Sequence, residues 1–205
     1  MDPQAVRSSV AKTLRGLRQF EVVLALILIF FPVALRLEDS TRESISKYHD
    51  LNDPRWYFMP LTAATMMFVV NGLVRREHGH NVVLGVLLFG VVFWDPVGVS
   101  RGLHTFSAAA FYLVAFSVIA LQLSAYLTKE EDRSKIGRQW LVTLATLVLL
   151  GAVMLSVKVA SNTFWMETIG LWLIALHYIW HSGRHARGLD DEEPSVVLPR
   201  LFGRG

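Results

Sequence analysis

Six long apolar runs separate the charged residues of this 205-residue chain, and they constrain its fold more than any other feature. The runs cover approximately residues 20–36, 56–74, 81–97, 103–127, 139–157 and 163–182. Each approaches the roughly 20 residues that a helix needs to cross a hydrocarbon core about 30 Å thick. Hydrophobic residues make up 53% of the chain and charged residues 18%, unlike an ordinary soluble domain. The sequence therefore predicts an all-α polytopic membrane protein, a bundle of six transmembrane helices.

Lys and Arg are distributed unevenly among the segments that flank these runs. Fourteen lie on the side that carries both chain ends, and six lie on the other side. Because cytoplasmic loops are enriched in Lys and Arg, both termini are predicted to be cytoplasmic in a multi-pass cell-membrane protein. We expect a basic segment at 1–19, a six-span domain at 20–182 with an outer loop at 37–55, and a disordered cytoplasmic tail at 183–205. Since such an excess of Lys and Arg sets topology, nucleic acid is not expected as a partner.

Polar residues gather at the helix ends that this topology places outside. The stretch 44–58 is the only long polar connection between two spans, and it carries hydroxyls, a histidine, carboxylates and an arginine. His104 and Glu167 lie inside apolar runs, where an ionisable group is costly and by default suggests a functional site. We predict an outward-facing polar pocket in which these two residues form a polar pair. The candidate ligand-binding residues are Ser44, Ser46, Tyr48, His49, Arg55, Asp95, His104 and Glu167.

The alternative interpretation of this polar set is structural, because Arg55, Arg101 and Lys158 could pair the carboxylates and simply tie helix ends together. The remaining polar and aromatic residues near run ends are expected at the membrane interfaces. Tyr57 and Tyr178 belong to this interfacial group, and Glu21 is expected at the inner interface.

A second candidate site is the motif His177-x-x-x-His181 in the last run. Spacing of four residues places both imidazoles on one helical face, as metal ligation requires. Without a third ligand the pair is a weak metal signal, and histidines at a helix end also favour the helix dipole and lipid head groups. No cysteine is present, so thiolate ligands and disulfides are excluded. No cofactor is expected, and zinc remains the alternative.

Short motifs resemble a known group of proteins. Ser44-Ile45-Ser46-x-Tyr48 followed by Arg55, Leu103-His104, and Phe164-Trp165-x-Glu167 are similar to motifs of the uncharacterised bacterial DUF998-type membrane proteins, distant relatives of the Frag1/DRAM/Sfk1 superfamily. This resemblance implies a bacterial inner-membrane protein but no activity. The late histidine pair and Asp95 also suggest the ceramidase- and progestin-receptor-like membrane hydrolases, although these residues fall at opposite membrane faces.

Three functional hypotheses follow. The first is a non-enzymatic membrane protein whose outward pocket or loop binds a small ligand, a membrane lipid head group or a protein partner. The second is a metal-dependent membrane hydrolase. The third is a small transporter, which is disfavoured because spans two to five carry no charged residue at mid-depth.

Overall fold

The chain, seen in a computed structural model, is helical throughout the residues that are described, namely 3–50, 53–74, 79–94, 96, 98–128 and 135–186, apart from short turns. Of residues 3–19, 126–128, 135–138 and 183–186, only the backbone is described. The elements are α1 (Pro3–Glu38), the 3-10 helix η1 (Ile45–Asp50), α2 (Arg55–Val74), α3 (Gly79–Phe93), α4 (Arg101–Thr128), α5 (Lys135–Ala160) and α6 (Thr163–Ala186).

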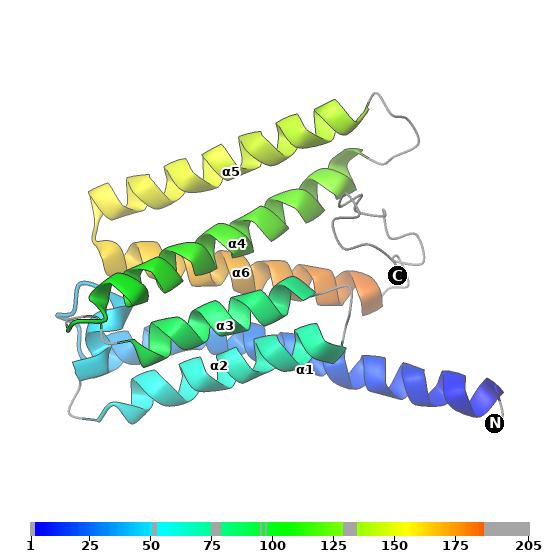
Figure 1. Cartoon of the computed structure of the whole chain (residues 1–205), viewed down its shortest axis with the longest axis horizontal. Helices are drawn as coiled ribbons and strands as arrows, with labels where there is room; N and C mark the ends of the chain where they lie inside the picture. The colour runs from blue at the N-terminus through cyan, green and yellow to red at the C-terminus, as the bar shows by residue number, and fades with distance from the viewer. Residues whose placement is uncertain are drawn as a thin grey trace.

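The six long helices run alternately in opposite directions (Figure 1). The loop 39–54 and the turns at 98–100 and 161–162 therefore meet at one end of the bundle, here called the loop end. The start of α1 and the end of α6 lie at the opposite end, here called the terminal end.

Among the described residues, four helical segments are long and apolar enough to cross a membrane. They are Phe20–Glu38, Arg55–Val74, Arg101–Ala125 and Gln139–Ala160. In the part of the chain that the structure describes, the expectation of an all-helical protein is thus confirmed, with four segments of membrane-spanning length and composition. Helix α3 is shorter, at 15 residues, and ends at residue 93 rather than 97. The tail expected at 183–205 falls outside the described residues from 187 onward, and α6 continues into its first four positions.

Capping residues explain where two helices at the loop end begin. Asp53 Oδ1 accepts a hydrogen bond from the Arg55 N–H at 3.2 Å, and Pro54 stands in the first helical turn, where its missing N–H costs nothing. Asn162 Oδ1 accepts a hydrogen bond from the Trp165 N–H at 3.2 Å in the same way. Asp53 lies at the end of the loop 39–54, and Asn162 lies beside this loop. The two helices that hold the loop, α2 and α6, therefore start at fixed positions.

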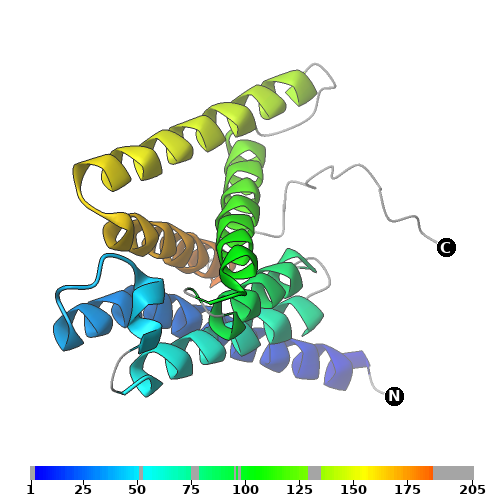
Figure 2. The same cartoon turned by 60° about the vertical axis from the view of Figure 1, so that its left-hand side comes forward.

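Close packing of α3 holds the centre of the bundle together, since α3 packs against α2 on one side and α4 on the other. A Cβ atom added at Gly85 would lie 2.5 Å from Val69 Cγ2 and 3.0 Å from the Thr65 carbonyl oxygen, so only glycine permits this approach of α2. Helix α5 packs only on α4 and α6 and is the outermost helix (Figure 2).

A buried polar cluster ties four helices together nearer the terminal end. The Asn71 side chain donates to Glu21 Oε1 at 3.2 Å, and the Tyr178 hydroxyl donates to Asn81 Oδ1 at 2.5 Å. Glu21 and Tyr178 are only 1% and 6% exposed, so the expected interfacial positions of these two residues were wrong. Polar partners on neighbouring helices make their burial tolerable.

Candidate functional site

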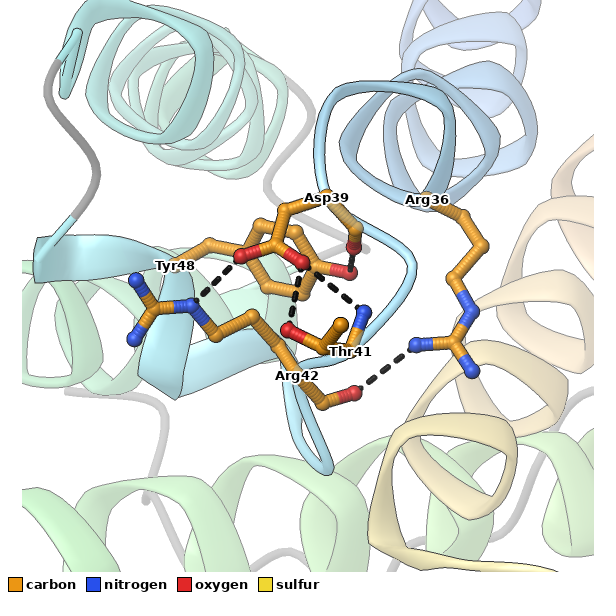
Figure 3. Close-up of polar contacts among 5 residues, drawn as sticks. All are labelled: Arg36, Asp39, Thr41, Arg42 and Tyr48. Carbon is orange, nitrogen blue, oxygen red and sulfur yellow. Dashed lines mark hydrogen bonds and ion pairs between the residues drawn. The ribbon is translucent and has the colours of Figure 1, made fainter.

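Loop residues 39–50 and 53–54 form a cap over the loop end of the bundle, which we call the loop cap. Figure 3 shows Asp39 at its centre, where the carboxylate accepts hydrogen bonds from the Thr41 N–H at 2.8 Å, the Thr41 hydroxyl at 2.6 Å and Arg42 Nε at 2.9 Å. The hydroxyl of the fully buried Tyr48 donates to the Asp39 carbonyl oxygen. Arg36 at the end of α1 donates to the Arg42 carbonyl oxygen at 2.8 Å. The loop is therefore folded onto α1.

A second set of contacts fixes the loop cap to α6. The Phe164 N–H donates to the Glu43 carbonyl oxygen at 2.6 Å, and the Ile45 N–H donates to Glu167 Oε2 at 2.6 Å. The ring of Phe164 packs against Tyr48, with centroids 5.8 Å apart, and the Arg36 guanidinium lies 4.8 Å above the same ring. Glu167 thus satisfies the first N–H of η1, which has no partner within its own helix.

Charge pairing stabilises the ionised carboxylates on the exposed face of the loop cap. Hydrogen bonds from Thr41 hold the pKa of Asp39 below its ordinary value, and the Lys47 ammonium does the same for the pKa of Glu43. Arg55 lowers the pKa of Asp53 through a bidentate pair at 2.8 and 2.7 Å. These three carboxylates have local partners and are at least partly exposed. Of the cations that the structural interpretation named, Arg55 is paired, but with Asp53 two residues before it, so this contact does not tie two helix ends together.

A pocket lies beneath the loop cap, between η1 and helices α2, α3, α4 and α6. Its cavity volume is about 40 Å³, room for a few water molecules, and its mouth is open. The polar lining residues are Ser46, Tyr57, His104, Tyr112 and Glu167, and the apolar ones are Ile45, Leu61, Leu88, Val91, Ala108, Phe111 and Leu171. An apolar cleft with a few convergent polar groups is the usual form of a small-molecule site.

Backbone contacts hold the polar side chains of the pocket in position. His104 Nδ1 lies 3.0 Å from the Trp94 carbonyl oxygen, and because a carbonyl only accepts, this nitrogen carries the proton. The Tyr112 hydroxyl donates to the Glu167 carbonyl oxygen at 3.0 Å. His104 and Glu167 line the same pocket, as expected, and their pairing with each other stays a prediction.

The predicted site residues divide into two groups. Ser46, His104 and Glu167 line the pocket, and Ser44 lies 3.0 Å from Ser46, measured between the two hydroxyl oxygens. The others have roles in the loop cap or at the surface: Tyr48 is a buried anchor, His49 packs edge-on against Tyr57 and Phe58, and Arg55 pairs with Asp53. Asp95 falls outside the described residues.

Two pocket residues were missed by the sequence analysis. Tyr57 was expected at the membrane interface, but it is 1% exposed and lines the pocket. Tyr112 lies in the middle of an apolar run, where nothing distinguishes a tyrosine that packs from one that lines a site. A signal was available in the sequence for Tyr57 alone, since it follows the polar loop directly.

The histidine motif forms a separate group on α6. The rings of His177 and His181 lie 6.1 Å apart, and the ring of His177 also lies 6.1 Å from that of Trp180. Among the residues that the structure describes, no group of three or more His, Asp or Glu side chains is arranged to hold a metal ion.

Fold and site together define a class, namely an α-helical protein with segments long and apolar enough to span a membrane and a capped pocket at one end of the bundle. Within that class, the chain belongs to the family of unknown function DUF7103, which matches residues 28–182 and so covers about three quarters of the chain. The matched range includes the loop cap and every pocket residue. No curated protein and no solved structure matches the chain.

This family assignment corrects the earlier resemblance. The similarity to DUF998-type proteins and the Frag1/DRAM/Sfk1 superfamily was wrong, because the family that matches is a different one. The expectation of a bacterial inner membrane depended on that similarity and loses its support. The short motifs misled because Tyr48 and Phe164 have general structural roles, as a buried anchor and its packing partner.

Proposed function

We propose that the protein is a membrane protein that binds a small ligand in the pocket beneath the loop cap, without catalysis. The observation that carries this proposal is that one pocket unites Ser46, His104 and Glu167, which lie on three different elements. Among the described residues, the Ser46 side chain forms a hydrogen bond with the Ser44 hydroxyl at 3.0 Å, which is unlike a nucleophile paired with a base. Neither the hydrolase nor the transporter hypothesis is favoured by a comparable observation.

The proposal includes a topology in which all six long helices cross the membrane, with the loop end outside and both termini in the cytoplasm. Alternating helix directions and the bias of fourteen to six in Lys and Arg support it. In this arrangement the loop cap and the pocket mouth face the outside of the cell.

The natural absence of cysteine allows a direct test of the topology, because each introduced cysteine is the only one. Ser40→Cys in the loop cap and Ser195→Cys in the carboxyl tail would be labelled in intact cells with a membrane-impermeant maleimide. We expect labelling of Ser40→Cys in intact cells, and of Ser195→Cys only after lysis. The reverse pattern would overturn the orientation, and labelling of both in intact cells would overturn the even number of spans.

The binding function can be tested by identifying what copurifies with the protein. Ala108 lines the pocket and is partly buried, whereas its neighbour Ala109 is exposed. Protein would be purified from membranes in mild detergent as the native chain, Ala108→Phe and Ala109→Phe, and bound small molecules would be extracted and analysed by mass spectrometry. We expect about one equivalent of a bound small molecule with the native chain and Ala109→Phe, and a loss with Ala108→Phe. Equal content in all three samples would contradict binding in this pocket.

A further inference from the structure

The pocket beneath the loop cap has the size and the lining of a site for water. Its cavity volume of about 40 Å³ has room for about three water molecules, since each needs roughly 10–15 Å³. An internal water also needs polar partners, and the lining supplies the side chains of Ser46, Tyr57, His104 and Glu167. Because the mouth is open, water in the pocket exchanges with the solution at the loop end.

Two oxygen atoms of the lining have hydrogen-bonding capacity that no described residue uses. Glu167 Oε2 accepts from the Ile45 N–H at 2.6 Å, and no described group donates to the other carboxyl oxygen, Oε1. The Tyr57 hydroxyl has no hydrogen-bond partner among the described residues, although Tyr57 is only 1% exposed. Since an unpaired polar group inside a protein is costly, both oxygen atoms require water in the pocket as their partner.

Glu167 also holds the loop cap against the bundle. Its Oε2 atom joins α6 to the Ile45 N–H, which is the first N–H of η1 and has no partner within its own helix. An ionised carboxylate that accepts from an N–H makes a charge-assisted hydrogen bond, roughly twice as strong as a bond to a neutral oxygen. The firmness with which the loop cap is held therefore depends on whether Glu167 carries a charge.

Both charge states of Glu167 are accessible in this position. Burial disfavours the ionised form, whereas the hydrogen bond from the Ile45 N–H favours it. No Lys or Arg lines the pocket to hold the charge, and α3 contributes only Leu88 and Val91 to the lining. Titratable or charged side chains at the loop end of the surrounding elements include Tyr57 of α2, His104 and Tyr112 of α4, Lys47 and His49 of η1, Arg36 of α1 and Lys158 of α5.

From this arrangement we infer that Glu167 is a proton-binding site that controls how firmly the loop cap is held. In the ionised form, Oε2 holds the Ile45 N–H by a charge-assisted hydrogen bond. Water in the pocket delivers a proton to Oε1, the carboxyl group becomes neutral, and the bond to Ile45 weakens. A fall in pH at the loop end therefore loosens the loop cap, and a rise tightens it again. The site goes beyond the proposed function, because its ligand is a proton carried by water.

Infrared titration tests proton binding directly, because a protonated carboxyl group has a C=O stretching band that a carboxylate lacks. Purified protein in nanodiscs would be titrated from about pH 9 to about pH 4 as the native chain, Glu167→Gln and Glu43→Gln. Glu43 is the control, since it is an exposed carboxylate of the loop cap outside the pocket. We expect a carboxyl band that grows as the pH falls, persists in Glu43→Gln and is missing from Glu167→Gln. If Glu167→Gln leaves the pH-dependent bands unchanged, the proton site is wrong.

Hydrogen–deuterium exchange of peptides that contain Ile45 tests the coupling to the loop cap. Rates would be divided by those of the unstructured chain at the same pH, because chemical exchange itself depends on pH. We expect protection in the native chain to fall about fivefold to tenfold as Glu167 is protonated, the difference between a charged and a neutral hydrogen bond. Glu167→Gln should show the lower protection at every pH, since its amide oxygen is neutral. An equal fall in Glu167→Gln and the native chain would assign the response to another group and overturn the control by Glu167.

Transfer into deuterium oxide tests whether the proton passes through the pocket, because the carboxyl band shifts once its proton is exchanged. Exchange should be fast in the native chain and Ala109→Phe, and slower in Ala108→Phe, whose ring fills the pocket. Equal exchange in all three proteins would overturn delivery of the proton by water in this pocket.

Discussion

Helix α5 and the bundle that surrounds the pocket differ in almost every structural respect. In α5 only 11% of the membrane-spanning segment is buried, against 44% in α2. The pocket takes its lining from η1, α2, α3, α4 and α6, and none from α5. The apolar segment of α5 is more hydrophobic than that of α2 and close to those of α1 and α4, although it is the least buried of the four. Hydropathy therefore predicts which helices can cross a membrane, whereas only packing shows which helices form the pocket.

The largest difference in stability between variants of α5 and variants of the bundle around the pocket is expected at glycines. Gly85→Leu should destabilise the protein by about 1–3 kcal/mol or prevent its accumulation, since the new side chain would collide with Val69 and the Thr65 backbone. Gly151→Leu in α5 is the matched control, because nothing lies within 4 Å of a Cβ added there. The midpoint of thermal unfolding in one detergent measures both variants, and equal losses would remove the distinction between α5 and the bundle.

The second-largest effect on stability is expected where the loop cap contacts α6. Glu167→Ala leaves the Ile45 N–H without its acceptor and is expected to cost about 1–3 kcal/mol of unfolding free energy. Glu167→Gln retains an acceptor and should cost clearly less. Thermal unfolding of the two variants measures the difference, and an equal cost for both would mean that the carboxylate charge, rather than the hydrogen bond, stabilises η1.

Removing the polar contact between α4 and α5 should have a smaller effect on stability. Thr143 Oγ1 donates to Ser124 Oγ at 2.8 Å, so Thr143→Val should lower stability by about 0.6 kcal/mol, the average for such bonds between membrane helices. Thr146 bonds only to the carbonyl oxygen of Val142 in its own helix, so Thr146→Val is the control. The amount of small molecule that copurifies with the protein should be unchanged in both variants. A loss of binding with Thr143→Val would show that α5 supports the pocket after all.

The smallest effect is expected on the exposed face of the loop cap, and it depends on pH. The folded protein lowers the pKa of Asp39 below its ordinary value of 3.8, so the folded state binds this proton less tightly than the unfolded chain does. The stabilisation is therefore present above about pH 4 and is lost as the pH falls through the lowered pKa. Unfolding midpoints of the native chain and Asp39→Asn should differ slightly at pH 7 and converge below pH 4. A constant difference down to pH 2 would contradict this role of Asp39.

Much of the fold could be predicted from the sequence, because apolar length and turn residues are local properties. The first run predicted the span in α1, but the helix begins at Pro3, since basic residues do not interrupt a helix. Predicting the end of α3 at residue 97 was wrong because the backbone leaves the helix at Trp94, ahead of Pro96.

The candidate site was predictable only where a polar group stood out from its surroundings. His104 and Glu167 were identified because ionisable groups are rare in apolar runs. Tyr112 could not be identified, because its role depends on the position of the Glu167 carbonyl oxygen, 55 residues away in the chain. Arg55 was selected for its charge, yet its partner is the neighbouring Asp53 at the surface.

The shortness of α3 has a consequence for the surrounding lipid. Fifteen helical residues measure about 22 Å, several ångströms less than the hydrocarbon thickness of about 30 Å. The close approach at Gly85 fixes α3 against the longer α2, so in the proposed six-span topology a bilayer would meet this hydrophobic mismatch by thinning locally. Such thinning would draw lipid head groups inward beside α3, which carries Leu88 and Val91 of the pocket wall on its inner side. The protein would thereby change the thickness of the bilayer that surrounds it.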